Sequence, residues 1–461
     1  MKQNNYITLL PGQQFISGIL VLLWMFCASC GKEFLEEKPN KSLLIPTTLA
    51  NFQSMLDNPL LNRMPALNII ASDDLQNNGN LVSLAFPAEK GAYLWEQDMY
   101  GGSVNIPDWE LPYQQLFYAN IVLDGLADMT SPEAKRLKGS ALFFRAFALF
   151  NLAQSFAKPF NAGTAKLAAG VPARLESDVN VKATRGTVQE TYDRIQADLK
   201  AASGVLNTTE NYKSRPSKHA VMALFARVYL SMQAYDQAER YADSALQISS
   251  ALIDYNTLNA TAANPVPIAI IDKNAEGIFY AIHTSYSFFN SALTAINPSI
   301  YQLYNSNDMR KTIFFNDKGG GLIGFKGSYN GDRTLYGGLA TDEMYLIRGE
   351  CLARKGNADL AMADLNTLLL NRWKKGTFVP FKATDGADAL KQILVERRKE
   401  LVWRGLRWSD LRRFNQDPIM AITLTRNSDG KIYTLLPNSN RYVFPIPDNE
   451  VRGSGIEQNP R

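Results

Sequence analysis

The sequence predicts an all-α fold in which paired helices stack into a superhelix, with long irregular loops and a few short strands. Three observations lead to this prediction. Several segments carry apolar residues at three- and four-residue spacing, which is typical of helices with one buried face. Two of these segments repeat each other. The stretch Leu258–Tyr336 between the two copies is rich in Asn, Gly, Pro, Tyr and Phe, which indicates loops with short strands.

The first predicted helices are Tyr113–Met129 and Pro132–Phe156, both with continuous apolar spacing. Proline suits the first turn of a helix, so Ser131-Pro132 marks a boundary, and we expect the two helices to pack as an antiparallel pair. Thr187–Leu206 is a further predicted helix, and it starts with the T-x-x-E pattern of a capping box.

The two repeated segments are Ala220–Ser249 and Glu343–Leu369, whose small residues coincide when the copies are aligned. This spacing is typical of a tetratricopeptide (TPR) helix pair, in which small residues let two helices pack closely. Two unrelated amphipathic hairpins remain the alternative. Since TPR-like units bury their apolar faces by stacking, two copies are too few. The helices expected at 113–156 and 387–414 are the natural additional units.

The composition argues against several classes of function. The net charge is +4 and basic residues are spread along the chain, whereas a nucleic-acid-binding protein presents a basic face. Only two histidines occur, which disfavours histidine-based catalysis and metal binding. The stretch GGGLIGFKGS fails as a phosphate-binding loop because Phe325 separates Gly324 from Lys326. We therefore expect no catalytic residue, no metal site, no cofactor and no nucleic-acid partner.

Two adjacent pairs of acids, Asp73-Asp74 and Asp342-Glu343, invite comparison with the carboxylates of glycosidases. Those carboxylates must be held several ångströms apart across a sugar, and adjacency in sequence does not supply that separation. We interpret both pairs as solvated acids in loops or at helix ends.

The N-terminus has the features of a bacterial lipoprotein signal peptide. Phe15–Phe26 is apolar but too short to span a bilayer, and the small residues Ala28 and Ser29 precede Cys30. We predict that residues 1–29 are a signal peptide and that Cys30 is the lipidation site. A plain secretory signal is the alternative.

The remaining chain is expected to form one domain. No change in composition marks a linker, so residues 30–461 are assigned to a single unit, with an N-terminal part of about 30–210 and a TPR-containing C-terminal part of about 211–461. Cys351 is the only thiol left in it, so the chain must fold without a disulfide.

The segment Leu390–Phe414 is dense in charged residues. Arg397 shares a helical face with apolar neighbours, and a buried charge without a partner is very costly. We therefore predict a structural ion pair in which Arg397 or Arg398 binds Glu350, which lies on the inward face of its own predicted helix.

Part of this segment, ERRKELVWRGLRWSDLRRF, resembles the C-terminal hallmark of the SusD/RagB family, an E-R-x-x-E-L stretch followed by a G-x-R-W-x-D-L stretch. Arg404 stands where the family usually has Glu, so the ion pair expected there is missing or reversed. Further stretches similar to the family follow in order along the chain: FLEEKP after the lipidated cysteine, YANIVLDGL, ALFFRAFALFNLAQSF, RPSKHAVMALFARVYL, EMYLIRGECLARKGN, and VFPIPDNEV with IEQNP.

The resemblance implies a TPR-based helical frame with ligand-binding loops grafted on it. It also implies a lipid anchor in the outer membrane, usually facing outward, and docking over a SusC-like TonB-dependent transporter. Family members carry out no reaction and bind mostly glycans, in some cases peptides. The leading expectation is therefore capture of oligosaccharides for uptake. The alternatives are a peptide-binding protein, a TPR adaptor and a cryptic glycosidase.

A sugar presents C–H faces that stack on aromatic rings and hydroxyls that need amides or carboxylates. We expect Trp95 and at least one ring from 286–336 to converge on one exposed patch. Trp109 has helical spacing and is expected to pack inside. The candidate ligand-binding residues are Trp95, Tyr100, Tyr286, Phe288, Phe289, Tyr329, Asn330 and Tyr336.

Overall fold

The computed structural model describes residues 46–79, 81, 86–270 and 273–461, so Cys30 and the predicted signal peptide lie outside the described residues. The chain from residue 48 to its end forms one compact unit, which is rich in helices and has a few short strands. In the part of the chain that the structure describes, no helix is long and apolar enough to cross a membrane.

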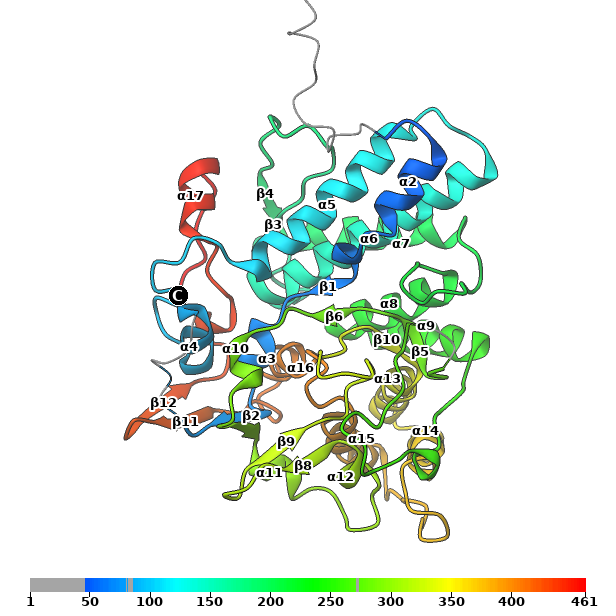
Figure 1. Ribbon diagram of the computed structural model, residues 1–461, viewed down its shortest axis with the longest axis vertical. Coiled ribbons are helices and arrows are strands. Elements are labelled where there is room, and N and C mark those ends of the chain that lie inside the picture. Colours follow the sequence, from blue (N-terminus) through cyan, green and yellow to red (C-terminus); the bar gives the residue numbers. More distant parts are fainter. Residues whose placement is uncertain (1–45, 80, 82–85, 271–272) are drawn as a thin grey trace, which may run out of the picture. The chain divides into compact units, whose positions relative to one another are not determined.

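Long helices form the frame of this unit (Figure 1). They are α5 (Pro107–Gly125), α6 (Pro132–Phe156), α7 (Val188–Ser203), α8 (Lys218–Ser231), α9 (Tyr235–Ile248), α13 (Thr341–Arg354), α14 (Ala358–Leu370), α15 (Gly386–Glu400) and α16 (Arg407–Phe414). Helix α6 packs between α5 and α7, and α13 contacts α9, α14 and α15.

Shorter elements fill the space around this frame. The short helices are α2 (Leu49–Leu56), α3 (Leu67–Ala71), α4 (Pro87–Leu94), α10 (Ser287–Asn290), α11 (Pro298–Tyr301), α12 (Arg310–Ile313) and α17 (Asp448–Ser454), with 3₁₀ turns at Pro59–Asn62, Tyr255–Thr257 and Asn440–Tyr442. The segment 258–336 contains the predicted loops and short strands, and in addition the short helices α10, α11 and α12, which its composition did not predict.

The described strands pair into two-stranded sheets. The parallel pair is β1 (Arg63–Met64) with β6 (Ile282–His283). The antiparallel pairs are β2 (Leu75–Asn77) with β7 (Thr294–Ile296), β3 (Ala169–Pro172) with β4 (Arg185–Thr187), β5 (Gly277–Phe279) with β10 (Leu339–Ala340), β8 (Phe315–Asp317) with β9 (Ile323–Phe325), and β11 (Leu424–Ser428) with β12 (Lys431–Leu435). The β2–β7 and β1–β6 pairs join the segment near residue 70 to the segment near residue 290.

The predicted helix ends agree with the structure where capping residues define them. Helix α6 has the predicted bounds, and the Ser131 hydroxyl accepts a hydrogen bond of 3.2 Å from the Ala134 N–H. The capping box of α7 is confirmed: Thr187 Oγ1 accepts from the Glu190 N–H at 3.1 Å and the Glu190 carboxylate accepts from the Thr187 N–H at 2.7 Å. Helix α5 begins before the predicted start because it runs through Pro112.

The repeated segments form two packed helix pairs, α8 with α9 and α13 with α14. The small residues meet at the second pair: a Cβ added to Gly349 would lie 3.5 Å from the carbonyl oxygen of Ala361. This distance is an ordinary van der Waals contact, so the two helices approach closely at Gly349. The core lies chiefly on α6, where Phe143, Phe144 and Phe147 surround the ring of Phe279 with centroid distances of 4.8, 6.0 and 5.4 Å.

Candidate functional site

Trp95 is not the open stacking platform that the sequence predicted. Only 2% of its surface is exposed, and its indole N–H donates a hydrogen bond of 2.9 Å to the carbonyl of Ala71. The Arg426 guanidinium lies 4.5 Å from the Trp95 ring and 3.9 Å from the Tyr93 ring. Arg426 thus covers the Trp95 ring, and the exposure that the sequence predicted for Trp95 is not found.

Most of the other predicted rings are also buried, and the hydroxyls of Tyr286 and Tyr100 find internal acceptors. Tyr286 donates to Asp108 at 2.7 Å, and Tyr100 donates to the Pro445 carbonyl at 2.6 Å. Phe289 is half-buried beside Trp403. The remaining members of the predicted set are at most 6% exposed: Tyr100, Tyr286, Phe288, Tyr329, Asn330 and Tyr336.

The segment around Trp95 and the segment 286–336 do come together, but inside the core. Strand β2 pairs with β7, the Tyr93 and Phe288 rings lie 5.2 Å apart, and Phe86 stacks on Tyr286 at 6.0 Å. The two segments thus meet through Tyr93 and Phe86 rather than through Trp95, and the patch they share is buried instead of exposed.

Arg397 makes the predicted buried ion pair, but with a different partner. Its Nε lies 2.9 Å from Asp410, whereas Glu350 accepts hydrogen bonds from Arg413 at 2.5 and 2.7 Å. Arg398 binds Asp73 and Asp74 instead. The predicted pairing fails because α16 follows Gly405, whose φ of 76° turns the chain, and brings its own arginine to Glu350.

The adjacent acids are buried and paired rather than solvated, which corrects the expectation for both pairs. Asp73 binds Arg407 at 2.7 Å, and although burial raises its pKa, Arg407 and Arg398 hold it at about 2. Glu343, fully buried in the first turn of α13, binds Arg227 of α8 at 2.6 Å. These acids join parts of the fold; Asp342 and Glu343 are fully enclosed, whereas Asp73 stays partly exposed in the pocket that Trp95 also lines.

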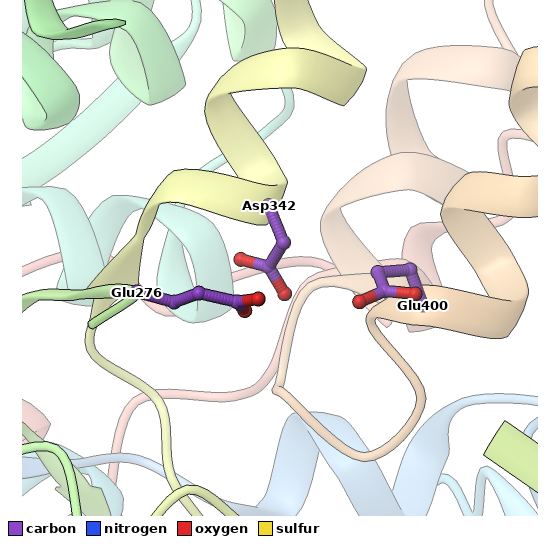
Figure 2. A group of neighbouring side chains, drawn as sticks. All are labelled: Glu276, Asp342 and Glu400. Carbon is purple, nitrogen blue, oxygen red and sulfur yellow. The ribbon is translucent and has the colours of Figure 1, made fainter. Parts of the chain in front are cut away.

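Figure 2 shows the densest group of acids, Glu276, Asp342 and Glu400, whose carboxylates face one another within 4.8 Å. Arg372 bridges Glu276 at 2.7 Å and Glu400 at 2.8 Å, and Arg404 binds Asp342 at 2.9 Å. Burial raises the pKa of Glu276 to about 7. A cation would have to displace these guanidinium groups, so the cluster is a structural ion-pair network. In it Arg404, which stands where the family usually has Glu, supplies a positive member by binding Asp342.

A large open groove, named here the α5 groove, lies between α5, the β3–β4 connection and the C-terminal segment around α17, with a volume of about 740 Å³. Three aromatic residues of α5 line it at four-residue steps: Trp109, Tyr113 and Phe117. Trp109 is buried as predicted, Tyr113 is half-buried with its hydroxyl bonded to the Pro172 carbonyl at 3.0 Å, and Phe117 is 39% exposed.

Polar side chains line the same groove. Exposed amides come from Gln114, Asn180 and Asn449, and carboxylates from Glu110 and Glu450. The pKa of Glu110 is raised by burial and by Glu450, which places the two carboxylates close together. The groove thus combines rings with hydrogen-bonding groups, the two requirements for holding a sugar chain.

Hydrogen bonds fix the wall opposite α5. The Arg174 guanidinium donates to the carbonyls of Asp178, Val179 and Val181 at 3.0 to 3.2 Å. The buried amide of Asn120 donates to the carbonyls of Arg174 and Glu176 at 3.0 and 3.2 Å. The loop is therefore held in place without a ligand, which limits the entropy lost on binding.

Sequence reasoning missed Phe117 and the loop 172–183. The signal that could have found Phe117 is the stripe W-x₃-Y-x₃-F on one helix, which extends past the two rings that pack inside. The loop carries no comparable signal.

Trp95 itself forms part of the floor of a separate, more polar pocket of about 430 Å³, whose rim includes Asn78, Asn297 and Asn427.

Comparisons with known proteins agree with the fold. Residues 33–230 match a family model described as starch-binding associating with outer membrane, and residues 341–461 match the model of the SusD family. No match was found among curated proteins.

Several solved structures share the fold. A SusD superfamily protein from Bacteroides thetaiotaomicron is 21% identical, with a TM-score of 0.71 over 90% of this chain and 100% of that one. A SusD-like carbohydrate binding protein from Bacteroides vulgatus is 20% identical, with a TM-score of 0.66 over 89% and 97%. Surface glycan-binding protein A from Bacteroides fluxus is 19% identical, with a TM-score of 0.68 over 90% and 100%.

Proposed function

The chain belongs to the SusD/RagB family, and on this premise we propose that it is an outer-membrane lipoprotein that binds oligosaccharides at the cell surface and passes them to a SusC-like TonB-dependent transporter. The α5 groove carries the binding part of this proposal. It is the largest of the pockets described above, and it offers the exposed ring of Phe117 beside amides and carboxylates. The protein acts by binding alone and is not an enzyme.

The remaining architecture is proposed to serve this role. The helix pairs α8–α9 and α13–α14 are two TPR-like units of one superhelix, supported by the packing within each pair and by the repeat in their sequences. Residues 30–461 form one mature domain, and Cys30 carries the lipid. The small residues before Cys30 and the matched model that is described as associating with outer membrane support the anchor.

The anchor can be tested by labelling cells with palmitate. The wild-type protein is expected to be labelled, and Cys30→Ser is expected to lose both the label and membrane association. Label retained in Cys30→Ser contradicts the assignment.

The proposed partner is tested by co-purification of a TonB-dependent transporter with the tagged wild-type protein from outer-membrane extracts. If no transporter co-purifies, that part of the proposal is contradicted.

Binding in the α5 groove can be tested with an oligosaccharide array followed by calorimetry, with maltoheptaose among the probes. Loss of one aromatic contact costs about 1.5 kcal/mol, so Phe117→Ala is expected to weaken binding roughly tenfold. Tyr212→Ala is the matched control, because Tyr212 is 56% exposed and lies outside the groove. Unchanged affinity in Phe117→Ala moves the site elsewhere.

The alternatives give different results in the same assay. A peptide-binding protein would bind unstructured peptides and leave the array blank, and a TPR adaptor would bind neither. A cryptic glycosidase would release new reducing ends from the bound oligosaccharide, and Glu110→Gln would abolish that release. The proposal predicts oligosaccharide recovered unchanged after incubation.

A further inference from the structure

The α5 groove, which carries the proposed function, has an acidic end. Glu110 lies in the first turn of α5 and Glu450 lies in the first turn of α17. Both residues line the groove and are half-buried, so their carboxylates can be reached from it. Burial raises the pKa of Glu110, and the charge of Glu450 raises it further. The two carboxylates therefore lie close enough to repel each other.

Neither carboxylate has a counter-charge within the described part of the chain. No lysine or arginine there forms an ion pair with Glu110 or Glu450. Most of the acids described above differ in this respect, since arginines hold Asp73, Glu343 and Glu350. A cation placed between two like charges removes their repulsion, so this end of the groove favours a positively charged group.

The basic residues of the groove are engaged or placed elsewhere. Arg174 donates to three carbonyls of the β3–β4 connection, and its own carbonyl accepts from the amide of Asn120. A rise of 1.5 Å per residue places Asn120 about 15 Å further along α5 than Glu110. Lys182 belongs to the same connection and forms no ion pair with either carboxylate. These residues therefore leave the acidic end negatively charged.

The same face of α5 offers contacts for the rest of a sugar chain. Gln114 and Phe117 follow Glu110 at helical spacing, and all three line the groove. The exposed ring of Phe117 lies about 10 Å along the helix from Glu110. One sugar unit can stack on this ring while a group on a neighbouring unit of the same chain reaches the two carboxylates.

An ammonium group suits this pair of acids better than a metal ion does. Calcium usually takes about six to eight oxygen ligands, whereas an ammonium needs acceptors only for its N–H donors. Hydrogen bonds between an ammonium and a carboxylate are also stronger than those between neutral groups. On the basis of the oligosaccharide binding proposed above, we propose that the α5 groove selects sugars with free amino groups, whose ammonium is held by Glu110 and Glu450.

Calorimetry at pH 6.5 with a chitosan pentamer, an oligomer of glucosamine, tests this proposal, because a sugar amine is mostly protonated at that pH. The chitin pentamer, in which each amine is N-acetylated, and cellopentaose, which has a hydroxyl at each of these positions, are the matched controls. Both keep the rings and remove the charge. The wild-type protein is expected to bind the chitosan pentamer about tenfold more tightly than either control.

Glutamine variants show which side chains read the charge. Glu110→Gln and Glu450→Gln each remove one charge and keep the shape of the side chain, so each is expected to lower the preference for chitosan over cellopentaose several-fold. The double variant is expected to lose this preference. Glu133→Gln, an exposed glutamate outside the groove, should retain it. Because the readout is a ratio of two affinities measured on one protein, a smaller folded fraction does not alter it.

Other outcomes overturn the proposal. Equal binding of the three pentamers, each weakened by Phe117→Ala, leaves oligosaccharide binding in the α5 groove and removes the selection of amines. A preference for chitosan that persists in the double variant places the reading of charge elsewhere. A lysine tripeptide that binds as tightly as the chitosan pentamer shows a site for basic peptides. Failure to bind any oligosaccharide, here or on the array, contradicts the proposed function itself.

Discussion

Glu350 has no exposed surface, yet its carboxylate meets two guanidinium groups. Arg413 binds it at 2.5 and 2.7 Å, and Arg354 at 2.9 Å. Removal of such a carboxylate is strongly destabilising, because its arginine partners stay buried without a counter-charge. Although burial acts to raise the pKa of Glu350, these arginines hold it below its ordinary range. The resulting stabilisation is present at neutral pH and is lost as the pH falls through the folded-state pKa.

We predict that Glu350→Gln lowers the free energy of unfolding at pH 7 by about 3–5 kcal/mol, because it leaves Arg413 without its main partner. Glu96→Gln is the control, since Glu96 pairs with Lys90 at the surface, where an ion pair contributes about 0–1 kcal/mol. Urea denaturation at pH 7 measures both. Equal losses in the two variants would contradict a dominant role for the buried pair.

At the scale of single residues, the sequence predicts the burial of a charged side chain better than it predicts the ion-pair partner of that side chain. The apolar neighbours of Arg397 were enough to place it inside, because they share its helical face. They could not name Asp410 as its partner, since that depends on the turn at Gly405. The aromatic residues failed for a related reason. Trp95 lies in a polar stretch, which suggested exposure, but Arg426, far away in the chain, covers its ring.

Asp108 shows how one side chain joins several elements. It lies in the first turn of α5 and accepts hydrogen bonds from the N–H groups of Ala66 and Leu67 at the start of α3, at 3.0 and 2.8 Å. Tyr286, just before α10, donates to its other oxygen. These bonds favour the charged form, but burial is the larger effect and raises the pKa of Asp108 to about 6 from 3.8.

This pKa shift has a definite sign. A carboxyl group whose folded-state pKa is raised stabilises the fold fully below its unfolded pKa, and that stabilisation is lost as the pH rises through the folded-state value. The unfolding free energy of the wild type relative to Asp108→Asn should therefore fall by about 2 kcal/mol between pH 4 and pH 7. Asp359→Asn, an exposed control, should show no such change. Urea denaturation at both pH values tests this prediction. A stability of the wild type relative to Asp108→Asn that rises from pH 4 to pH 7 would contradict the raised pKa.

At the scale of elements, the sequence predicted those helix ends that depend on side chains next to the helix. Ser131-Pro132 and the capping box at Thr187 define helix ends through side chains next to the helix, so these ends were predictable. The α5 groove was not, because its opposite walls come from the β3–β4 connection and the C-terminal segment. Only the stripe on α5 is local, and its first two rings also pack in the core.

For the molecule as a whole, buried ion pairs join the regions matched by the two family models. Arg227 binds Glu343 and Asp73 binds Arg407, and the Arg412 guanidinium donates to the carbonyl of Gln154 in α6. The N-terminal region therefore contains two charges, those of Arg227 and Asp73, whose partners lie in the C-terminal region. This arrangement favours one domain that folds as a unit over two domains that fold independently.

We predict that neither fragment, 46–250 nor 251–461, folds alone, and that mixing them restores the native near-UV circular dichroism. The cut falls in the exposed loop after α9, so it leaves both helix pairs intact. Each separated ion pair leaves a buried charge that costs about 3–5 kcal/mol, and two of these are comparable with the whole stability of a typical domain, about 5–15 kcal/mol. Cooperative unfolding of either fragment alone would show independent domains and contradict the single-domain assignment. In that case the interface charges would have to be solvated in the separated fragments.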